Sequence, residues 1–281
     1  TEFDGSILIN TDGSTGTLSG AQKNTGLGHE VFDDLTSGTS NTAIGYLTLT
    51  KNTTGSSNVA IGNNALAANT TGASNIGIGS GSLDANTEGD ANTAVGASAY
   101  TAGTTGDNNT AIGRSALAAN TTADNNTAVG KDAMLSNTTG TQNSALGHEA
   151  LASNTEGNYN TALGRLALYE NTTASSNTAV GLSALEKNTT GNDLVAVGCG
   201  ALYSNTTAPD NIAVGYQSQY NTTTGHSNVS MGWQSMVSNT TGDGNTALGF
   251  KALFTNNGST PDFNVAVGRQ ALYSTTSGYR N

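Results

Sequence analysis

Apolar and polar residues follow one another along this chain in a pattern that returns every 17 residues. A large aliphatic residue or Met precedes a Gly, a small residue precedes that aliphatic residue, and an Asn stands four positions before the Gly in 14 of 15 copies. The Gly recurs at intervals of 17 from Gly28 to Gly249, and a last copy follows at Gly268. We therefore expect two parts: residues 1–23 as a non-repeating cap or assembly strand, and residues 24–281 as a repeat domain.

The residue types within a repeat predict strands and turns. Thr, Asn and Gly are poor helix formers, and β-branched residues between glycines are typical of short strands separated by turns. Seventeen residues are close to one turn of a β-solenoid, in which successive turns stack about 4.8 Å apart as parallel strands. The sequence thus predicts an all-β fold, a parallel β-solenoid (β-roll or β-helix) of about 15 coils that forms an oligomeric fibre.

Side chains in a strand alternate between two faces, so a large residue and its small neighbour should point in opposite directions. We expect the large residues, such as Ile61 and Leu66, to fill the coil and the small ones to face outward. An outward column of small residues implies that a neighbouring molecule approaches closely. The opposite assignment would expose a long apolar stripe and would require a partner even more strongly. The predicted oligomer interface comprises Ala43, Ala60, Ala94, Ala111, Ala128, Ala162 and Ala179.

Asn recurs at two positions of the repeat, which predicts ladders of side-chain hydrogen bonds between successive coils. Asn also tolerates the left-handed backbone that corners require. The alternative role is glycosylation, because the sequence Asn-Thr-Thr forms an acceptor site. It begins at Asn52, Asn69, Asn120, Asn137, Asn171, Asn188, Asn205, Asn221 and Asn239.

Composition excludes several functions. The net charge of −11 argues against nucleic-acid binding, which is driven by Lys and Arg. The longest apolar runs are three or four residues, so no transmembrane helix is expected, and the first residues have no signal-peptide pattern. The three His residues lie in no catalytic or metal-ligand spacing. We therefore predict that the chain is not an enzyme and has no cofactor, with calcium as the one exception considered next.

Three Asp residues, Asp90, Asp107 and Asp124, occupy the same position in three consecutive repeats. Carboxylates stacked about 4.8 Å apart repel one another, and Ca²⁺ would relieve this repulsion with their oxygens as ligands. The alternative is a solvated acidic edge that keeps the protein soluble.

Aromatic residues gather in the variable positions after the repeat Gly, mostly in the later repeats. Exposed aromatic side chains suit contact with a sugar or a protein. The predicted surface-contact residues are Tyr169, Tyr203, Trp233, Phe250 and Tyr273.

The motif "NTAVG" at residues 92–96, 126–130 and 177–181, followed by "xxAL", resembles the head repeats of trimeric autotransporter adhesins of the YadA type. The longer pattern "NTAVGKDAMLSNTTG" at residues 126–140 is similar to repeats of phage tail-fibre proteins. The resemblance implies left-handed β-rolls, three chains associated in parallel, and a fibre that binds a host cell or surface.

Three functions remain open at this point. The first is a structural and adhesive fibre on the cell surface, in the extracellular space or on a virion. Its partners would be copies of itself, as a homotrimer or homopolymer, and a cell-surface glycan or protein receptor. The second is an ice-binding protein that uses a flat Thr/Ala array. The third is a filament subunit whose N-terminal strand "SILIN" pairs with the end of the next molecule.

Overall fold

The computed structural model describes residues 7–10, 19–256 and 262–275. The chain divides into two compact units, Thr1–Gln142 and Asn143–Asn281. Every regular element among the described residues is a β-strand, and none is a helix. The all-β prediction is therefore confirmed.

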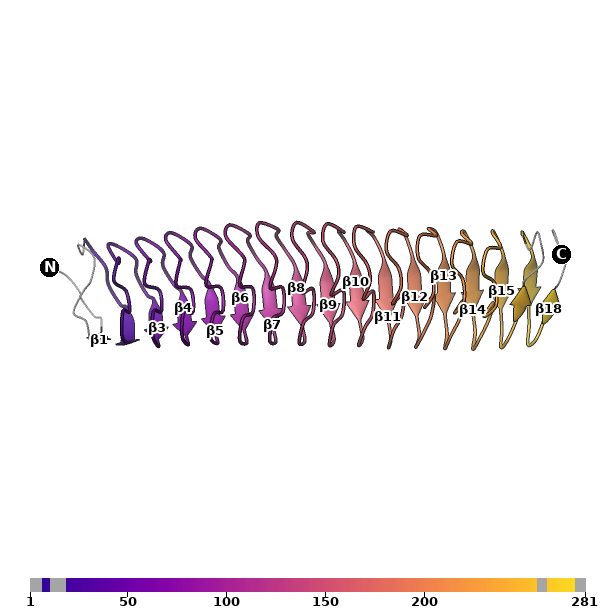
Figure 1. The fold of residues 1–281 in the computed structure, drawn as a ribbon, viewed down its shortest axis with the longest axis horizontal. Coiled ribbons are helices and arrows are strands. Elements are labelled where there is room, and N and C mark those ends of the chain that lie inside the picture. Colours follow the sequence, from indigo (N-terminus) through magenta and orange to yellow (C-terminus); the bar gives the residue numbers. More distant parts are fainter. Residues whose placement is uncertain (1–6, 11–18, 257–261, 276–281) are drawn as a thin grey trace. The chain divides into compact units, whose positions relative to one another are not determined.

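Strands of the first unit stack side by side in one parallel sheet (Figure 1). Its described residues form β1 (Ile7–Asn10), β2 (Thr25–Gly28), β3 (Thr42–Ile44), β4 (Val59–Ile61), β5 (Ile76–Ile78), β6 (Thr93–Val95), β7 (Thr110–Ile112) and β8 (Thr127–Val129). β1 pairs with β2 at an offset of 18 residues. From β2 to β8, consecutive strands pair at an offset of 17, as in the match of Ala43 with Ala60.

The second unit repeats this arrangement. Its described residues form β9 (Ser144–Leu146), β10 (Thr161–Leu163), β11 (Thr178–Val180), β12 (Val195–Val197), β13 (Ile212–Val214), β14 (Val229–Met231), β15 (Thr246–Leu248), β16 (Thr255–Asn256), β17 (Val265–Val267) and β18 (Ser274–Thr275). Two short strands, β16 and β18, pair separately from the main sheet. The strand pairing confirms a parallel β-solenoid of about 15 coils with a 17-residue repeat.

The interior of a coil differs from the prediction. Ala60, Ala65 and Leu66 are fully buried, whereas Ile61 lies on the outer face and is only half-buried. The prediction that Leu66 belongs to the core is confirmed, but the one that Ile61 fills the coil is wrong. The coil is too narrow for two large columns, as Gly77 of β5 shows: a Cβ placed there would lie 3.4 Å from Leu66 Cδ1.

A left-handed backbone places two consecutive residues inside the coil. Leu66 has φ 52°, and the other large residues four positions after the repeat Gly share this conformation. In an extended strand Ala65 and Leu66 would point to opposite sides, but this turn directs both inward. A bulky residue in this conformation costs about 1–3 kcal/mol, an amount comparable to the roughly 1.5–3 kcal/mol that burial of a Leu side chain contributes.

One column of buried Asn forms the predicted ladder. Asn69 Nδ2 donates to Asn52 Oδ1 at 2.8 Å, and Asn86 Nδ2 donates in turn to Asn69 Oδ1 at 2.8 Å. These side chains are fully buried. Each amide therefore needs the coils on both sides of it to complete its hydrogen bonds.

The second Asn column bonds mainly through the backbone. The Asn58 N–H donates to Asn41 Oδ1 at 2.9 Å. Its own Nδ2 donates to the Gly72 carbonyl at 2.8 Å, and Asn69 Nδ2 donates to the same carbonyl at 3.0 Å. One carbonyl in the coil thus joins the two Asn columns across the interior.

Tyr100 substitutes for a missing Asn in the first unit. Its ring lies in the Leu column and is fully buried, and Gly103 stands where neighbouring coils have Asn. A Cβ at Gly103 would lie 2.2 Å from the Tyr100 ring, so only Gly leaves room for it. The Tyr100 hydroxyl accepts from Nδ2 of Asn109 at 3.0 Å and of Asn120 at 2.9 Å.

We expect Gly79→Ala to destabilise the fold far more than Gly81→Ala. Gly79 has φ +133°, and its Cβ would lie 2.5 Å from the Gly96 carbonyl oxygen. Gly81 has φ +64° and an open surrounding, with the nearest atom at 3.9 Å. The expected losses in unfolding free energy are about 3 kcal/mol and about 1 kcal/mol. Thermal unfolding followed by circular dichroism measures both, and equal losses would contradict the account.

Tyr100→Phe should change how stability depends on pH. Burial raises the pKa of the Tyr100 hydroxyl above its ordinary value. The unfolded chain releases this proton near pH 10 while the folded chain retains it, so the stabilisation is present below about pH 10 and is lost as pH rises further.

The Phe variant should lose about 1–3 kcal/mol at pH 7, because Asn109 and Asn120 lose their acceptor. It should also lose less additional stability than the unchanged protein between about pH 9.5 and 11. Urea unfolding across this range measures both quantities, and a variant with the same alkaline loss would show that Tyr100 does not contribute to it.

Candidate functional site

The outside of the parallel sheet carries two uncharged columns of side chains: a mixed column of Thr, Ser, Val and Ile at the first position of each strand, and an aliphatic or Met column at the third. We define the outer sheet face as the first and third residues of each strand. In the first unit its third-position members Leu27, Ile44, Ile78 and Ile112 are 36–47% exposed. No member in either unit carries a charge, although charged residues are 10% of the chain.

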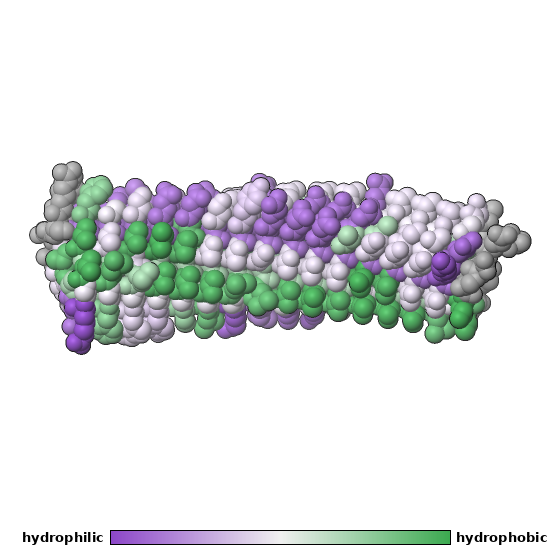
Figure 2. Space-filling view, turned by 180° about the vertical axis from the view of Figure 1, so that it is seen from behind, coloured by the Kyte–Doolittle hydropathy of each residue, from purple (hydrophilic) through white to green (hydrophobic). Residues whose placement is uncertain are grey.

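The second unit has the same outer sheet face. Leu146, Leu163, Met231, Leu248 and Val267 are 36–67% exposed. Figure 2 shows hydrophobic residues gathered into a band along the coils. With about eight strands spaced about 4.8 Å apart, and a width of about 10 Å, each unit presents roughly 400 Å² of this face, about half of it from the aliphatic third-position column.

The predicted Ala interface is wrong. Ala43, Ala60, Ala94, Ala111, Ala128, Ala162 and Ala179 are the middle residues of their strands and are 0% exposed. Small residues occupy this column because the strand packs directly on the buried Ala-Leu segment of its own coil. The aliphatic column is therefore on the outer face, as in the opposite assignment of the two faces considered from the sequence.

The N-terminal strand is paired within its own chain. Residues Ile7 to Asn10 of "SILIN" form β1, which pairs in parallel with β2 so that Ile7 matches Thr25 and Ile9 matches Leu27. β1 is therefore the first strand of the sheet, with β2 on one edge. Pairing of its other edge with the next molecule stays a prediction. Ile7 and Ile9 are 63% and 60% exposed and extend the outer sheet face by one strand.

Four of the five predicted surface aromatics stack on rings of adjacent coils. Trp233 and Phe250 have centroids 5.1 Å apart and planes inclined by 7°. Tyr203 stacks on Tyr220 at 4.9 Å, and Tyr273 stacks on Phe254 at 5.1 Å. Tyr216 and Tyr220 were not among the predicted contacts. Tyr216 lies 17 residues before Trp233 and Tyr220 lies 17 residues after Tyr203, so the repeat spacing would have identified both.

The same aromatic residues lie at the surface. Trp233, Phe250 and Tyr273 are 37–42% exposed, and Tyr169 and Tyr203 are half-buried. Partial burial, reinforced by the carboxylate of Glu186, raises the pKa of Tyr203.

The Asp column forms backbone contacts. Asp107 Oδ1 accepts from the Asp90 N–H at 2.7 Å, and Asp124 Oδ1 accepts from the Asp107 N–H at 2.8 Å. Asp90 accepts from the Ala73 N–H in the same way. Across the described chain these three carboxylates do not form a group of ligand atoms within 4.8 Å of one another. The predicted calcium site has no cluster to support it, and each Asp holds the coil before it.

The Asn-Thr-Thr sites are mostly inside the coils. Eight of the nine Asn side chains are fully buried, and Asn221 alone is half-buried. Asn221 stands one position earlier in its repeat than the others, and Thr222 occupies the buried position. A buried amide that donates two hydrogen bonds has no room for a glycan, so the eight sites serve the ladder.

The Thr column after these Asn residues also bonds within the chain. Thr53 Oγ1 donates to the Thr70 carbonyl at 3.0 Å, and Thr70 Oγ1 donates to the Thr87 carbonyl at 2.9 Å. The Ala columns that would complete a flat Thr/Ala surface lie inside the coil. The Ala part of the predicted array is therefore not at the surface, whereas Thr53 and Thr70 are half-buried. Ice binding itself stays a prediction.

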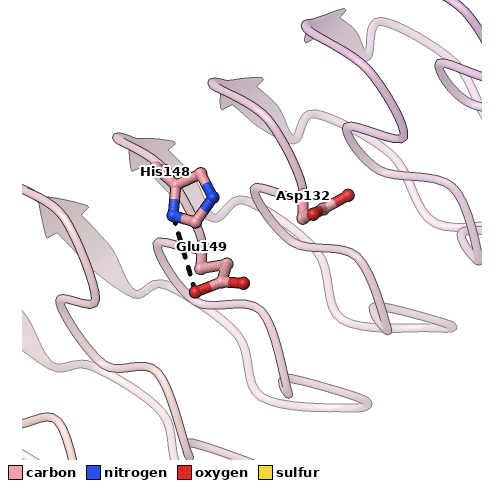
Figure 3. Close-up of side chains that lie close together, drawn as sticks. All are labelled: Asp132, His148 and Glu149. Carbon is pink, nitrogen blue, oxygen red and sulfur yellow. Dashed lines mark ion pairs between the residues drawn. The ribbon is translucent and has the colours of Figure 1, made fainter.

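Each His lies beside one carboxylate. His148 Nδ1 is 3.5 Å from Glu149 Oε2 (Figure 3), and His226 Nε2 is 3.3 Å from Asp243 Oδ2. His29 has Glu30 at 3.5 Å.

A shallow groove in the first unit brings Lys51 and Asp84 to one surface. Burial raises the pKa of the Asp84 carboxyl. The rest of the lining is neutral, consisting of Leu47, Thr50, Asn64, Ala67 and Ala68.

The described part of the chain contains no helix that is long and apolar enough to cross a bilayer. Neither a protein-family model nor a curated protein matches this sequence.

We expect Asn171→Ala to destabilise the protein and Asn221→Ala to have little effect, although both begin an Asn-Thr-Thr site. Asn171 Nδ2 donates to Asn154 Oδ1 at 2.9 Å and to the Ala174 carbonyl at 3.0 Å. Its loss leaves buried groups without partners and should cost about 1–3 kcal/mol. Asn221→Ala should change stability by less than about 0.5 kcal/mol. Chemical denaturation of both variants measures the difference, and similar values would refute the ladder.

Proposed function

We propose that this chain is a structural and adhesive fibre segment that self-associates and contacts a host or another surface. The outer sheet face supports the proposal most directly. It is uncharged in both units, and its third-position column is aliphatic and partly exposed. An exposed face of this kind is typical of a site of association.

A second copy of the same face is the partner that its chemistry fits best. The chain carries a net charge of −11, yet none of that charge lies on the outer sheet face. A partner recognised by charge would use another surface, whereas two uncharged apolar faces complement each other.

The repetitive interior fits a fibre better than an enzyme. The buried Asn and Ala-Leu columns serve the stacking of coils, and each His pairs with a half-buried carboxylate at the surface. A trimer follows from the resemblance to adhesin heads and tail fibres, as does an extracellular, cell-surface or virion location. Both are parts of the proposal, together with a glycan or protein receptor.

Introducing charge on the outer sheet face should dissociate the assembly. The test variant is Ile78→Lys with Ile112→Lys, because both residues are exposed third members of their strands. Each Lys would be buried without a partner in the assembly, at a cost of about 3–5 kcal/mol. Sedimentation equilibrium should give a discrete oligomer for the unchanged protein and a monomer for this variant.

The matched control is Thr71→Lys with Thr122→Lys, which adds the same charge at exposed positions outside the outer sheet face. This control should keep the oligomer. A monomeric unchanged protein would refute self-association, an open polymer would favour the filament, and an oligomer that survives the Ile78 and Ile112 changes would exclude this face as the interface.

A further inference from the structure

A surface of the second unit, apart from the outer sheet face, combines stacked aromatic rings with positive charge. We name it the cationic aromatic patch. It consists of Tyr216, Trp233, Phe250, Lys251, Phe254, Arg269 and Tyr273.

Flat groups continue from coil to coil along this patch. Tyr216 stacks on Trp233 with centroids 5.7 Å apart, and Trp233 stacks on Phe250 at 5.1 Å. The Arg269 guanidinium follows in the next coil, 5.7 Å from the Phe250 centroid. Both faces of Trp233 and Phe250 are therefore covered, and these rings present their edges to solvent.

Lys251 lies among three rings of the patch. Its Nζ is 5.1 Å from the Trp233 centroid, 5.7 Å from that of Phe250 and 4.7 Å from that of Phe254. Neither Lys251 nor Arg269 forms an ion pair with any residue that the structure describes. The rings hold both cations without neutralising them.

The local charge is opposite to that of the whole chain. The segments 215–222, 232–239, 249–256 and 268–275, which carry the patch, contain Lys251 and Arg269 and no Asp or Glu. The chain as a whole has a net charge of −11. The edges of aromatic rings are the positive part of their quadrupole, so the exposed ring edges add to the attraction that the two cations exert on an anion.

We propose that the cationic aromatic patch binds an anionic polysaccharide. Lys251 and Arg269 pair with its carboxylates or sulfates, and the ring edges contact the sugar backbone. This inference rests on the proposed function of surface contact and names the chemical class of the ligand.

The geometry favours a polysaccharide over a nucleic acid. Single-stranded nucleic acids bind by stacking bases on open ring faces, and the faces of Trp233 and Phe250 are occupied. Contacts that recur about every 4.8 Å from coil to coil suit a linear polymer that presents regularly spaced groups.

Trp233 provides a direct measurement, because it is the one Trp of the chain. The full chain is titrated with heparin as a sulfated polymer, polygalacturonate as a carboxylated polymer, dextran as a neutral polymer and polyglutamate as an acidic peptide. We expect heparin, polygalacturonate or both to change Trp233 emission with saturation, and the responding polymer identifies the anion. Dextran and polyglutamate should give no change. An equal response to either of them would overturn the proposal.

Removing the two cations should weaken binding. Lys251→Gln with Arg269→Gln should raise Kd about tenfold or more, since each cation near a polyanion contributes roughly a factor of five. The control, Lys51→Gln with Lys131→Gln, makes the same change in net charge. It removes cations that are paired with Asp34 and Asp132, and its Kd should stay within about twofold of the unchanged value.

Circular dichroism and the ligand-free emission of Trp233 confirm that each variant is folded. Equal weakening in both double variants would show that only net charge matters and would overturn the site. If no polysaccharide binds while sedimentation still shows an oligomer, this inference fails and the fibre function stands. If binding occurs in a monomeric chain, self-association fails and this inference stands.

Discussion

Buried amides that are completed only by the next coil are the interaction on which this structure depends. Asn69 donates to the coil before it and accepts from the coil after it, and its amide also bonds to the Gly72 carbonyl of its own coil. An isolated coil would leave these groups unsatisfied in a dry interior, at a cost of about 1–3 kcal/mol each. The requirement constrains the bonded positions and not the total length of a repeat, since Asn264 still donates to Asn245 Oδ1 across an interval of 19 residues.

Sequence periodicity predicts the coil but not which side of the strand faces inward. The 17-residue spacing, the strands and the Asn columns follow from residue type and counting. The orientation of Ile61 does not, because strand alternation is equally compatible with either face inside. It is decided by the left-handed backbone at Leu66, which turns a neighbouring pair, Ala65 and Leu66, into the interior together. Leu rarely adopts this conformation, so its identity gives no hint of it.

The candidate surfaces, too, can be predicted from the sequence only in part. Columns of aromatic residues can be read directly from the repeat, and four of the five that the sequence singles out take part in stacks. The stacking direction depends on coil spacing and turns the rings edge-on to solvent, which residue counting does not reveal. The involvement of Lys251 is equally hidden, because its contacts with Trp233 and Phe254 join residues from different positions of different repeats.

Interruptions of the Asn column give the stack a pattern of strong and weak joints. Asn86 and Asn205 each face a coil that has Gly103 or Thr222 in place of Asn, and the Oδ1 atoms of both accept no hydrogen bond from the described residues. In a structure whose coils contact mainly their neighbours, stability is a sum of local terms. Under tension or partial denaturation such a chain opens first where adjoining coils share the fewest bonds. These two substitutions therefore define where a stack of coils would separate and how long the intact segments would be.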